Sequence, residues 1–218
     1  MKKKSAKRIL IVLGILFLPC IFWLLLTRGT NHFRHLEIFG PKDVNEKGDT
    51  IYHTIPSFSF INQEGKTITD KDVDNKIYVA NFFFATCPTV CPKMNENLRG
   101  IAENFKDVDD VRFLSFTVNP EHDSVPVLAE YAQKRNANPK QWWFLTGDKD
   151  SIYTLAGEGF KLMAARGKTA DDFFHDQNLV LIDKEKRIRG FYDGLDDADV
   201  RKLNDEIKVL LYEYVEKK

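Results

Sequence analysis

Proline is absent after Pro139, and cysteine is scarce throughout, with three in 218 residues. Neither charge sign is in excess, because 32 Lys and Arg balance 32 Asp and Glu. A nucleic-acid-binding domain requires a basic face, so the charge balance gives no support for a nucleic-acid partner. Internal repeats and low-complexity tracts are also missing. Hydrophobic residues make up 43% of the chain and include 17 Phe, which indicates a folded core rather than disorder.

Charged residues are missing altogether from Ile9–Leu26, a stretch of 18 residues that is long enough to span a bilayer core. Five Lys and Arg precede it, a bias that keeps the N-terminus in the cytoplasm. A cleaved signal peptide is the alternative, but the small residues of a cleavage site are missing. Cys20 also lacks the small residue that normally precedes a lipid-modified cysteine. We expect residues 1–27 to form a basic tail and a transmembrane helix of a bacterial inner (cell) membrane, with the rest on the periplasmic or extracytoplasmic side.

Beyond this segment, strands and helices alternate. We expect residues 28–51 to be a tether and residues 52–218 to form one domain. The predicted strands are Phe58–Ile61, Lys66–Thr69, Ile77–Phe84, Val111–Val118, Trp142–Thr146, Asn178–Asp183 and Arg187–Tyr192. The predicted helices are one through Met94, Leu98, Ile101 and Phe105, then Val125–Arg135, Lys149–Ala156 and Asp197–Glu216. This order, ending in a hairpin and a helix, indicates a thioredoxin-like three-layer α/β sandwich.

Two of the cysteines lie where a strand turns into a helix. Ile77–Phe84 has the length and composition of a buried central strand. Cys87 and Cys91 follow, and Pro92 fits the first turn of a helix, so Cys91 is predicted at or beside the N-cap. The positive end of the helix dipole lowers the pKa of a thiol and favours the thiolate, which binds metal or attacks a disulfide. The sequence therefore predicts the functional site on this loop.

The two thiols have three possible roles: a structural disulfide, a redox pair or two metal ligands. A disulfide closing so short a loop would constrain the unfolded chain little. Thioredoxin-type oxidoreductases have two residues between their cysteines, whereas this loop has three. They also place a cis-proline before the strand that begins the terminal hairpin, where this chain has His175 and no proline.

Two thiolates and an imidazole make a soft metal site, so Cys87, Cys91 and His175 are the predicted ligands. Such a site suits Cu(I) and, with an added ligand, accepts Cu(II). Zinc is the alternative metal, but a fourth strong protein ligand is not evident. The simpler interpretation of His175 is a solvated loop histidine. The place of His175 in the predicted fold disfavours this interpretation.

Over residues 52–215 the chain resembles the Sco/SenC family of copper chaperones for cytochrome c oxidase. The resemblance rests on Cys87-Pro88-x-x-Cys91-Pro92, the segment Val118–Pro126, Trp143-x-Leu145-Thr146-Gly147 and His175. It implies a membrane-anchored copper-binding domain whose copper ligands are Cys87, Cys91 and His175. It also implies two partners: oxidase subunit II or a similar copper-dependent oxidase, whose dinuclear copper centre is assembled, and an upstream copper donor.

The chain departs from the family pattern in one loop. Asn119-Pro120 stands where the family commonly has Asp-Pro, and one extra residue separates Asp123 from Pro126. This difference puts in doubt a role for Asp123 as an acid beside the metal.

The favoured function is binding and transfer rather than enzymatic turnover. The alternative is a thiol–disulfide reductase that keeps the copper-ligand cysteines of the oxidase reduced. In that case Cys87 and Cys91 form a redox-active disulfide, and His175 tunes the thiols. A peroxidase on the same fold is disfavoured, because its nucleophile loop would look different.

Overall fold

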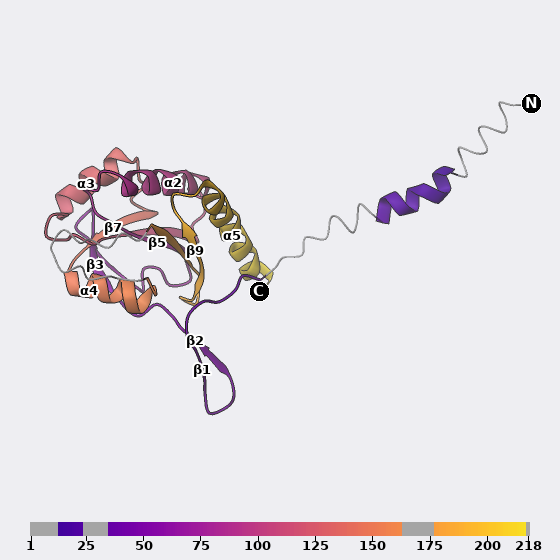
Figure 1. Ribbon diagram of the computed structural model, residues 1–218, viewed down its shortest axis with the longest axis horizontal. Helices are drawn as coiled ribbons and strands as arrows, with labels where there is room; N and C mark the ends of the chain where they lie inside the picture. The colour runs from indigo at the N-terminus through magenta and orange to yellow at the C-terminus, as the bar shows by residue number, and fades with distance from the viewer. Residues whose placement is uncertain (1–12, 24–34, 163–176, 217–218) are drawn as a thin grey trace, which may run out of the picture. The chain divides into compact units, whose positions relative to one another are not determined.

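The structure is a computed structural model that describes residues 13–23, 35–162 and 177–216 (Figure 1). The chain divides into two compact units, Met1–Arg34 and His35–Lys218. In the first, residues 13–23 form a helix in which Cys20 is exposed. Within the described ranges no helix has the length and apolar character needed to cross a membrane. The predicted span, Ile9–Leu26, extends beyond the described helix at both ends.

The second unit contains nine described strands and five helical segments. The strands are β1 (Lys42–Val44), β2 (Thr50–Tyr52), β3 (Ser59–Asn62), β4 (Thr67–Thr69), β5 (Ile77–Phe83), β6 (Val111–Thr117), β7 (Trp142–Thr146), β8 (Asn178–Ile182) and β9 (Ile188–Asp193). The helices are α2 (Val90–Asn104), α3 (Val125–Lys134), α4 (Lys149–Thr154), the π-helical η1 (Leu155–Gly159) and α5 (Asp197–Glu216). The predicted elements of the domain are confirmed to within a few residues.

One prediction needs correction at the end of α4. The sequence predicts a helix to Ala156, but the α-helix ends at Thr154 and the chain continues as a π-helical turn to Gly159. Two glycines in this turn lower the preference for a regular helix. A Cβ at Gly159 would lie 3.1 Å from the Cδ of Pro56, so this turn packs closely on the segment before β3.

Seven strands form one sheet in the order β4-β3-β7-β6-β5-β8-β9. β5, β6 and β7 are parallel to one another, and β8 runs antiparallel to β5. All seven residues of β5 are buried, as expected for a strand covered on both faces. The observed topology confirms the predicted thioredoxin-like α/β arrangement.

Helices cover both faces of this sheet, with α2, α3 and α5 along one side and α4 along the other (Figure 1). Successive residues of a strand point to opposite faces, and Phe82 and Phe83 show this at the end of β5. Phe82 stacks on Phe116 with ring centroids 5.2 Å apart, while Phe83 contacts Tyr131 of α3 at 4.9 Å. Each face therefore has its own aromatic cluster beneath the end of the central strand.

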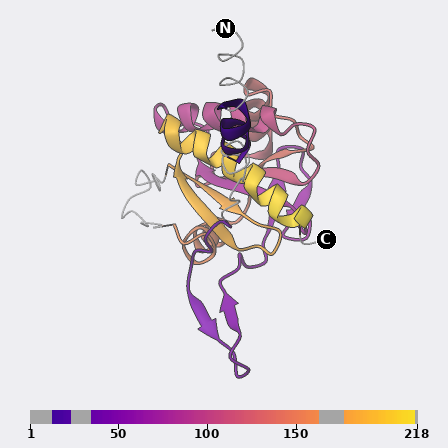
Figure 2. The same cartoon turned by 90° about the vertical axis from the view of Figure 1, so that its right-hand side faces the viewer.

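β1 and β2 pair only with each other in the described sheets and form a hairpin that extends from the body of the domain (Figures 1 and 2). Immediately before it, Phe39 forms a bridge with Ile188 of β9. Residues 28–51 were predicted as a tether, and the described part, from His35 on, includes this ordered hairpin and backbone contacts with the domain. The contacts were not predictable locally, because the partner strand lies about 150 residues later in the sequence.

Candidate metal-binding site

The two cysteines lie at the junction between β5 and α2, as predicted. Cys87 is in the loop and Cys91 is in the first turn of α2, and both are buried free thiols. The helix begins at Val90 with Thr89 as N-cap. Cys91 therefore lies about one residue further into the helix than the predicted position at or beside the N-cap, whereas Pro92 lies in the first turn as predicted.

The sulfur of Cys87 caps the helix. Thr89 makes no side-chain cap hydrogen bond; instead, the backbone N–H of Cys91 donates to Sγ of Cys87 over 3.4 Å. The first N–H groups of a helix have no partner within the helix, so a sulfur carrying negative charge is favoured at this position. The loop thus brings both thiols to one end of α2.

The two thiols differ in acidity. Burial acts to raise the pKa of Cys87, but hydrogen bonds from the backbone of Cys91, Thr89 and Val90 and from the Cys91 thiol outweigh it, so the pKa is lowered. Burial raises the pKa of Cys91 to about 12, although the backbone at Phe84 acts in the opposite direction. The predicted lowering by the helix end is thus supported for Cys87, and it is wrong for Cys91, where burial dominates.

A buried carboxylate holds the start of the cysteine loop. Asp123 has no exposed surface, and its Oδ2 accepts hydrogen bonds from the backbone N–H of Ala85 at 2.9 Å and the hydroxyl of Thr117 at 2.5 Å. The Nδ1 atom of His122 lies 2.9 Å from its other oxygen. Both oxygens are engaged by the protein, so Asp123 positions the loop two residues before Cys87.

Sequence reasoning left the role of Asp123 open, although a usable signal was present. β5 and β6 are adjacent and parallel, so the segments that follow them leave the same edge of the sheet. Ala85 follows β5, and Asp123 follows β6. An acidic residue after a buried parallel strand could therefore have been predicted to contact the cysteine loop. Asp123 also holds the neighbouring His122: the imidazole is half-exposed, and its Nδ1 atom contacts the buried carboxylate.

A chain of buried polar groups lies beneath α2. Asn81 of β5 donates to Asn95 of α2 over 3.1 Å, and Asn95 donates to the hydroxyl of Tyr131 over 2.8 Å. The guanidinium of Arg135 lies 3.3 Å from the centre of the Tyr131 ring. Buried amides are costly unless paired, so these bonds fix the rotation of α2, on which Cys91 is carried. These hydrogen-bonded residues could not be predicted from local sequence, because they are spread over three elements.

The third predicted ligand, His175, lies outside the described residues. Among the residues that the structure does describe, no group of three or more His, Cys, Asp and Glu side chains is placed to hold a metal ion. His53 lies with its Nε2 atom 2.7 Å from the carbonyl oxygen of Gly159. The described part of the site is therefore the pair Cys87 and Cys91, and a pair of thiols fits a soft metal ion.

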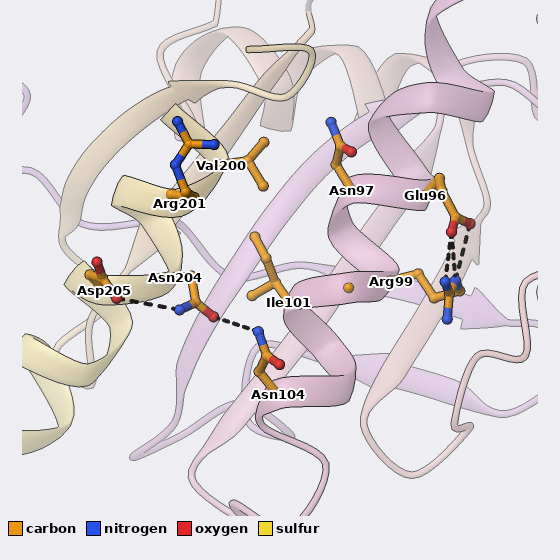
Figure 3. A pocket seen from close by; sticks show the side chains of 10 residues that line it. Glu96, Asn97, Arg99, Ile101, Asn104, Val200, Arg201, Asn204 and Asp205 are labelled. Atoms are coloured by element: carbon orange, nitrogen blue, oxygen red, sulfur yellow. Dashed lines mark hydrogen bonds and ion pairs between the residues drawn. The ribbon is translucent and has the colours of Figure 1, made fainter. Parts of the chain in front are cut away.

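A groove of about 540 Å³ lies between α2 and α5, away from the cysteines (Figure 3). Figure 3 shows Asn104 and Asn204 bridging the two helices, with Asn204 also contacting Asp205. On the other side, Glu96 and Arg99 pair with each other. These polar side chains are therefore paired with one another. The residues that line the groove include no thiol or other soft metal ligand of the kind found on the cysteine loop.

Comparison with known proteins identifies relatives over most of the domain. The family model described as SCO1/SenC matches residues 46–211. The chain is similar to the crystal structure of a SCO1/SenC family lipoprotein from Bacillus anthracis, with 28% identity, a TM-score of 0.67, and coverage of 73% of this chain and 95% of that one. It is also similar to BsSco, described as a member of the Sco family of cytochrome c oxidase assembly proteins with a disulfide switch. That match has 26% identity, a TM-score of 0.64, and coverage of 72% and 93%.

A third relative was solved with its metal. Arabidopsis thaliana ScoI with copper bound has 26% identity to this chain and a TM-score of 0.60, over 73% of this chain and 98% of that one. The family match includes the strand, the cysteine loop and the helix described above. By this match, the chain belongs to the SCO1/SenC family.

Proposed function

We propose that this protein binds a copper ion through Cys87, Cys91 and His175 and transfers it during assembly of cytochrome c oxidase. The recipient is the dinuclear copper centre of subunit II or a similar copper-dependent oxidase, and an upstream donor supplies the ion. The observation that carries the proposal is the pair of buried, free thiols at the start of α2, one of them with a lowered pKa. Copper in the solved A. thaliana relative supports the choice of metal.

The arrangement of the loop suits binding and release of a soft cation. A thiolate is the form of cysteine that binds metal, and the backbone hydrogen bonds to Cys87 favour that form before any ion arrives. Asp123 fixes the backbone at Ala85, so the thiol of Cys87 is presented in one position. The imidazole of His175 would complete a three-ligand site, which leaves a side open for exchange with a partner.

We further propose that residues 1–27 anchor the protein in the bacterial cell membrane, with the domain on the extracytoplasmic side. The support is the uncharged stretch Ile9–Leu26 and the five basic residues before it. The lipoprotein relative from B. anthracis is compatible with membrane attachment of such domains.

Thiol–disulfide exchange is the second candidate function. The difference in acidity between Cys87 and Cys91 is the observation that favours it, because an attacking thiolate beside a protonated partner is the arrangement of a reducing dithiol. The disulfide switch named for BsSco supports redox activity in this family. The two functions differ in their need for the histidine: exchange requires two thiols, whereas the copper site requires three ligands.

Copper retention tests the binding site. The full-length protein in detergent is reduced, loaded anaerobically with Cu(I) and desalted, and the bound copper is quantified. We expect one copper per wild-type chain and near-complete loss in Cys87→Ser, Cys91→Ser and His175→Ala. Cys20→Ser is the matched control, because it removes a thiol outside the domain and should retain one copper. Loss in Cys20→Ser, or wild-type retention in His175→Ala, would contradict the assigned ligand set.

Oxidase activity in cells separates the two functions. His175→Ala and the double variant Cys87→Ser/Cys91→Ser are expressed in a strain that lacks the wild-type protein and grows at limiting copper. A copper chaperone predicts an equal loss of oxidase activity in both. Full activity with His175→Ala and none with the double variant would replace copper delivery with the reductase function.

A further inference from the structure

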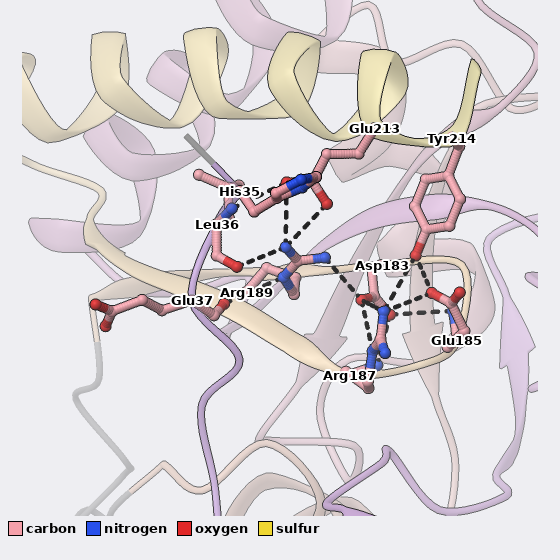
Figure 4. A network of polar contacts seen from close by, with 9 residues as sticks. All are labelled: His35, Leu36, Glu37, Asp183, Glu185, Arg187, Arg189, Glu213 and Tyr214. Atoms are coloured by element: carbon pink, nitrogen blue, oxygen red, sulfur yellow. Dashed lines mark hydrogen bonds and ion pairs between the residues drawn. The ribbon is translucent and has the colours of Figure 1, made fainter. Parts of the chain in front are cut away.

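The segment that precedes the β1–β2 hairpin is bound to the domain by an arginine and a glutamate (Figure 4). The backbone N–H of Leu36 donates to Oε1 of Glu213 over 2.9 Å. Arg189 donates through Nη2 to the carbonyl of Leu36 over 2.6 Å and through Nε to the carbonyl of Glu37 over 3.1 Å. The N–H of Phe39 then donates to a β9 carbonyl over 2.9 Å. Residues 36–39 are thus held mainly through their backbone.

The same arginine is the centre of a buried ionic cluster. Its Nη1 atom lies 3.0 Å from Asp183 and its Nη2 atom 3.0 Å from Glu213. No more than 3% of any of these three side chains is exposed. Arg187, which is less buried, pairs with Asp183 from the outer side. Burial of charged groups is tolerated only when each is paired and hydrogen-bonded.

The N-terminal segment completes this cluster. A guanidinium has five N–H donors, and the two carboxylates do not take all of them. The carbonyls of Leu36 and Glu37 accept from Nη2 and Nε, so detaching residues 36 and 37 would remove the acceptor of Nε and leave Nη2 with Glu213 alone. An unsatisfied donor on a charged group is costly. The cluster therefore favours the state in which residues 36–39 are bound.

This attachment point lies at the end of the sheet that is remote from the cysteines. Ile182 of β8 pairs with Tyr78, near the beginning of β5, and Ile188 of β9 pairs with Ile182. The cysteine loop instead follows Phe83, at the other end of β5. A strand of this length spans roughly 20 Å at about 3.3 Å per residue. The chain enters the domain at one end of β5, and the cysteines follow the other.

We propose that Arg189, Asp183 and Glu213 form a clamp that fixes the entry point of the N-terminal segment opposite the cysteine loop. This inference rests on the proposed function in that it takes residues 1–27 as a membrane anchor and the cysteine loop as the site of copper transfer. A loosely attached chain could cover the loop or leave the domain to tumble about its tether. The clamp holds residues 36–39 at the end of β5 opposite the thiols, so that this stretch does not cover the cysteine loop and the loop remains free to meet a partner protein. Arg189 is thus a positioning residue.

Hydrogen exchange on the full-length protein in detergent tests the clamp. Leu36→Pro removes the N–H that Glu213 accepts and leaves the three charged side chains intact, while Leu36→Ala is the matched control that keeps this N–H. We expect Phe39 to be protected in the wild type and in Leu36→Ala, and to lose about tenfold or more of its protection in Leu36→Pro. Amides of β5 report that each variant is folded. Should Leu36→Pro lower their protection, a two-glycine insertion between Glu37 and Ile38 provides the same test.

Unprotected amides at Leu36 and Phe39 of the wild type, or unchanged protection of Phe39 in Leu36→Pro, would overturn the clamp. The positioning role has its own readout: oxidase activity at limiting copper should fall in Leu36→Pro while copper retention by the purified variant stays at the wild-type level. Wild-type oxidase activity together with lost protection would refute the positioning role. Failure of the wild type itself to retain copper would instead refute the proposed function, and the exchange result would still decide whether the clamp exists.

Discussion

The buried polar groups at the two ends of the central strand β5 differ in whether they are paired. At its beginning, Arg189 is enclosed by Asp183, Glu213 and two backbone carbonyls, so its charge is fully compensated. At its end, Cys87 and Cys91 are buried free thiols whose pKa values are moved in opposite directions. The ionic cluster has little to gain in free energy from a further ligand, because its charges are already paired. The two free thiols at the start of α2 can still bind one. The difference separates the end that carries the proposed clamp from the end that carries the proposed metal ligands.

The largest effect is expected at the compensated end. Arg189→Met removes the charge and leaves the carboxylates of Asp183 and Glu213 buried. Breaking a buried pair in this way costs about 3–5 kcal/mol, so the free energy of unfolding should fall by about that amount in urea denaturation of the full-length protein. Lys134→Met is the control, because it breaks an exposed pair with Glu130 and should lower the free energy of unfolding far less. Equal effects of the two variants would contradict the buried-cluster account.

A smaller loss of stability, with a larger effect on binding, is expected from Asp123→Ala. Hydrogen bonds to a charged group contribute about 1.5–3 kcal/mol, and this variant leaves the N–H of Ala85 and the hydroxyl of Thr117 without their acceptor. Copper affinity should fall with stability, because the backbone before Cys87 is released. Competition with a Cu(I) chelator measures the affinity. His122→Ala, which spares both bonds to Oδ2, should change it much less; an equal change would assign the effect to the histidine instead.

Much of the fold, but only part of the site, could be predicted from the sequence. β5 was predictable because a strand buried on both faces has an uninterrupted apolar sequence, and α5 because its apolar residues repeat at helical spacing. The residues that organise the ends of β5 were not. Arg189 and Glu213 gain their roles from contacts with residues 152 and 177 positions away, and no local pattern records such a pairing.

The cysteines show the same division within one motif. Their position between strand and helix followed from local sequence, and so did the lowered pKa of Cys87. The raised pKa of Cys91 did not, because it depends on how deeply the first turn of α2 is buried in the assembled domain. His175 was placed by the expected order of elements, and it remains a prediction.

The two thiols of the metal-free, reduced protein should react in a fixed order. Cys87 has a pKa below its ordinary value of 9.0, so its thiolate forms first as the pH rises. Cys91, with a pKa of about 12, stays protonated through the neutral range. Iodoacetamide should therefore modify Cys87 faster than Cys91 at pH 7 to 8. Peptide mass analysis gives the two rates, and Cys91→Ser shows the Cys87 rate alone. Faster modification of Cys91 would contradict the assignment.

The same shifts have opposite consequences for stability. A thiol with a lowered folded pKa contributes stability that is fully present above its unfolded pKa and is lost as the pH falls through the folded pKa. Cys91 has a raised pKa, so its contribution is present below the unfolded value and is lost as the pH rises towards about 12. We expect a small effect: Cys91→Ser should reduce the decline in the free energy of unfolding between pH 9 and 11, measured by urea denaturation. An unchanged decline would mean that Cys91 is not the group responsible.

X-ray absorption spectroscopy of the Cu(I)-loaded, full-length protein tests the proposed ligand set, because it reports the atoms bound to the metal. We expect two sulfur ligands and one histidine nitrogen, with the nitrogen contribution lost in His175→Ala and one sulfur lost in Cys87→Ser or Cys91→Ser. A spectrum with sulfur ligands alone, or a histidine contribution that persists in His175→Ala, would contradict it.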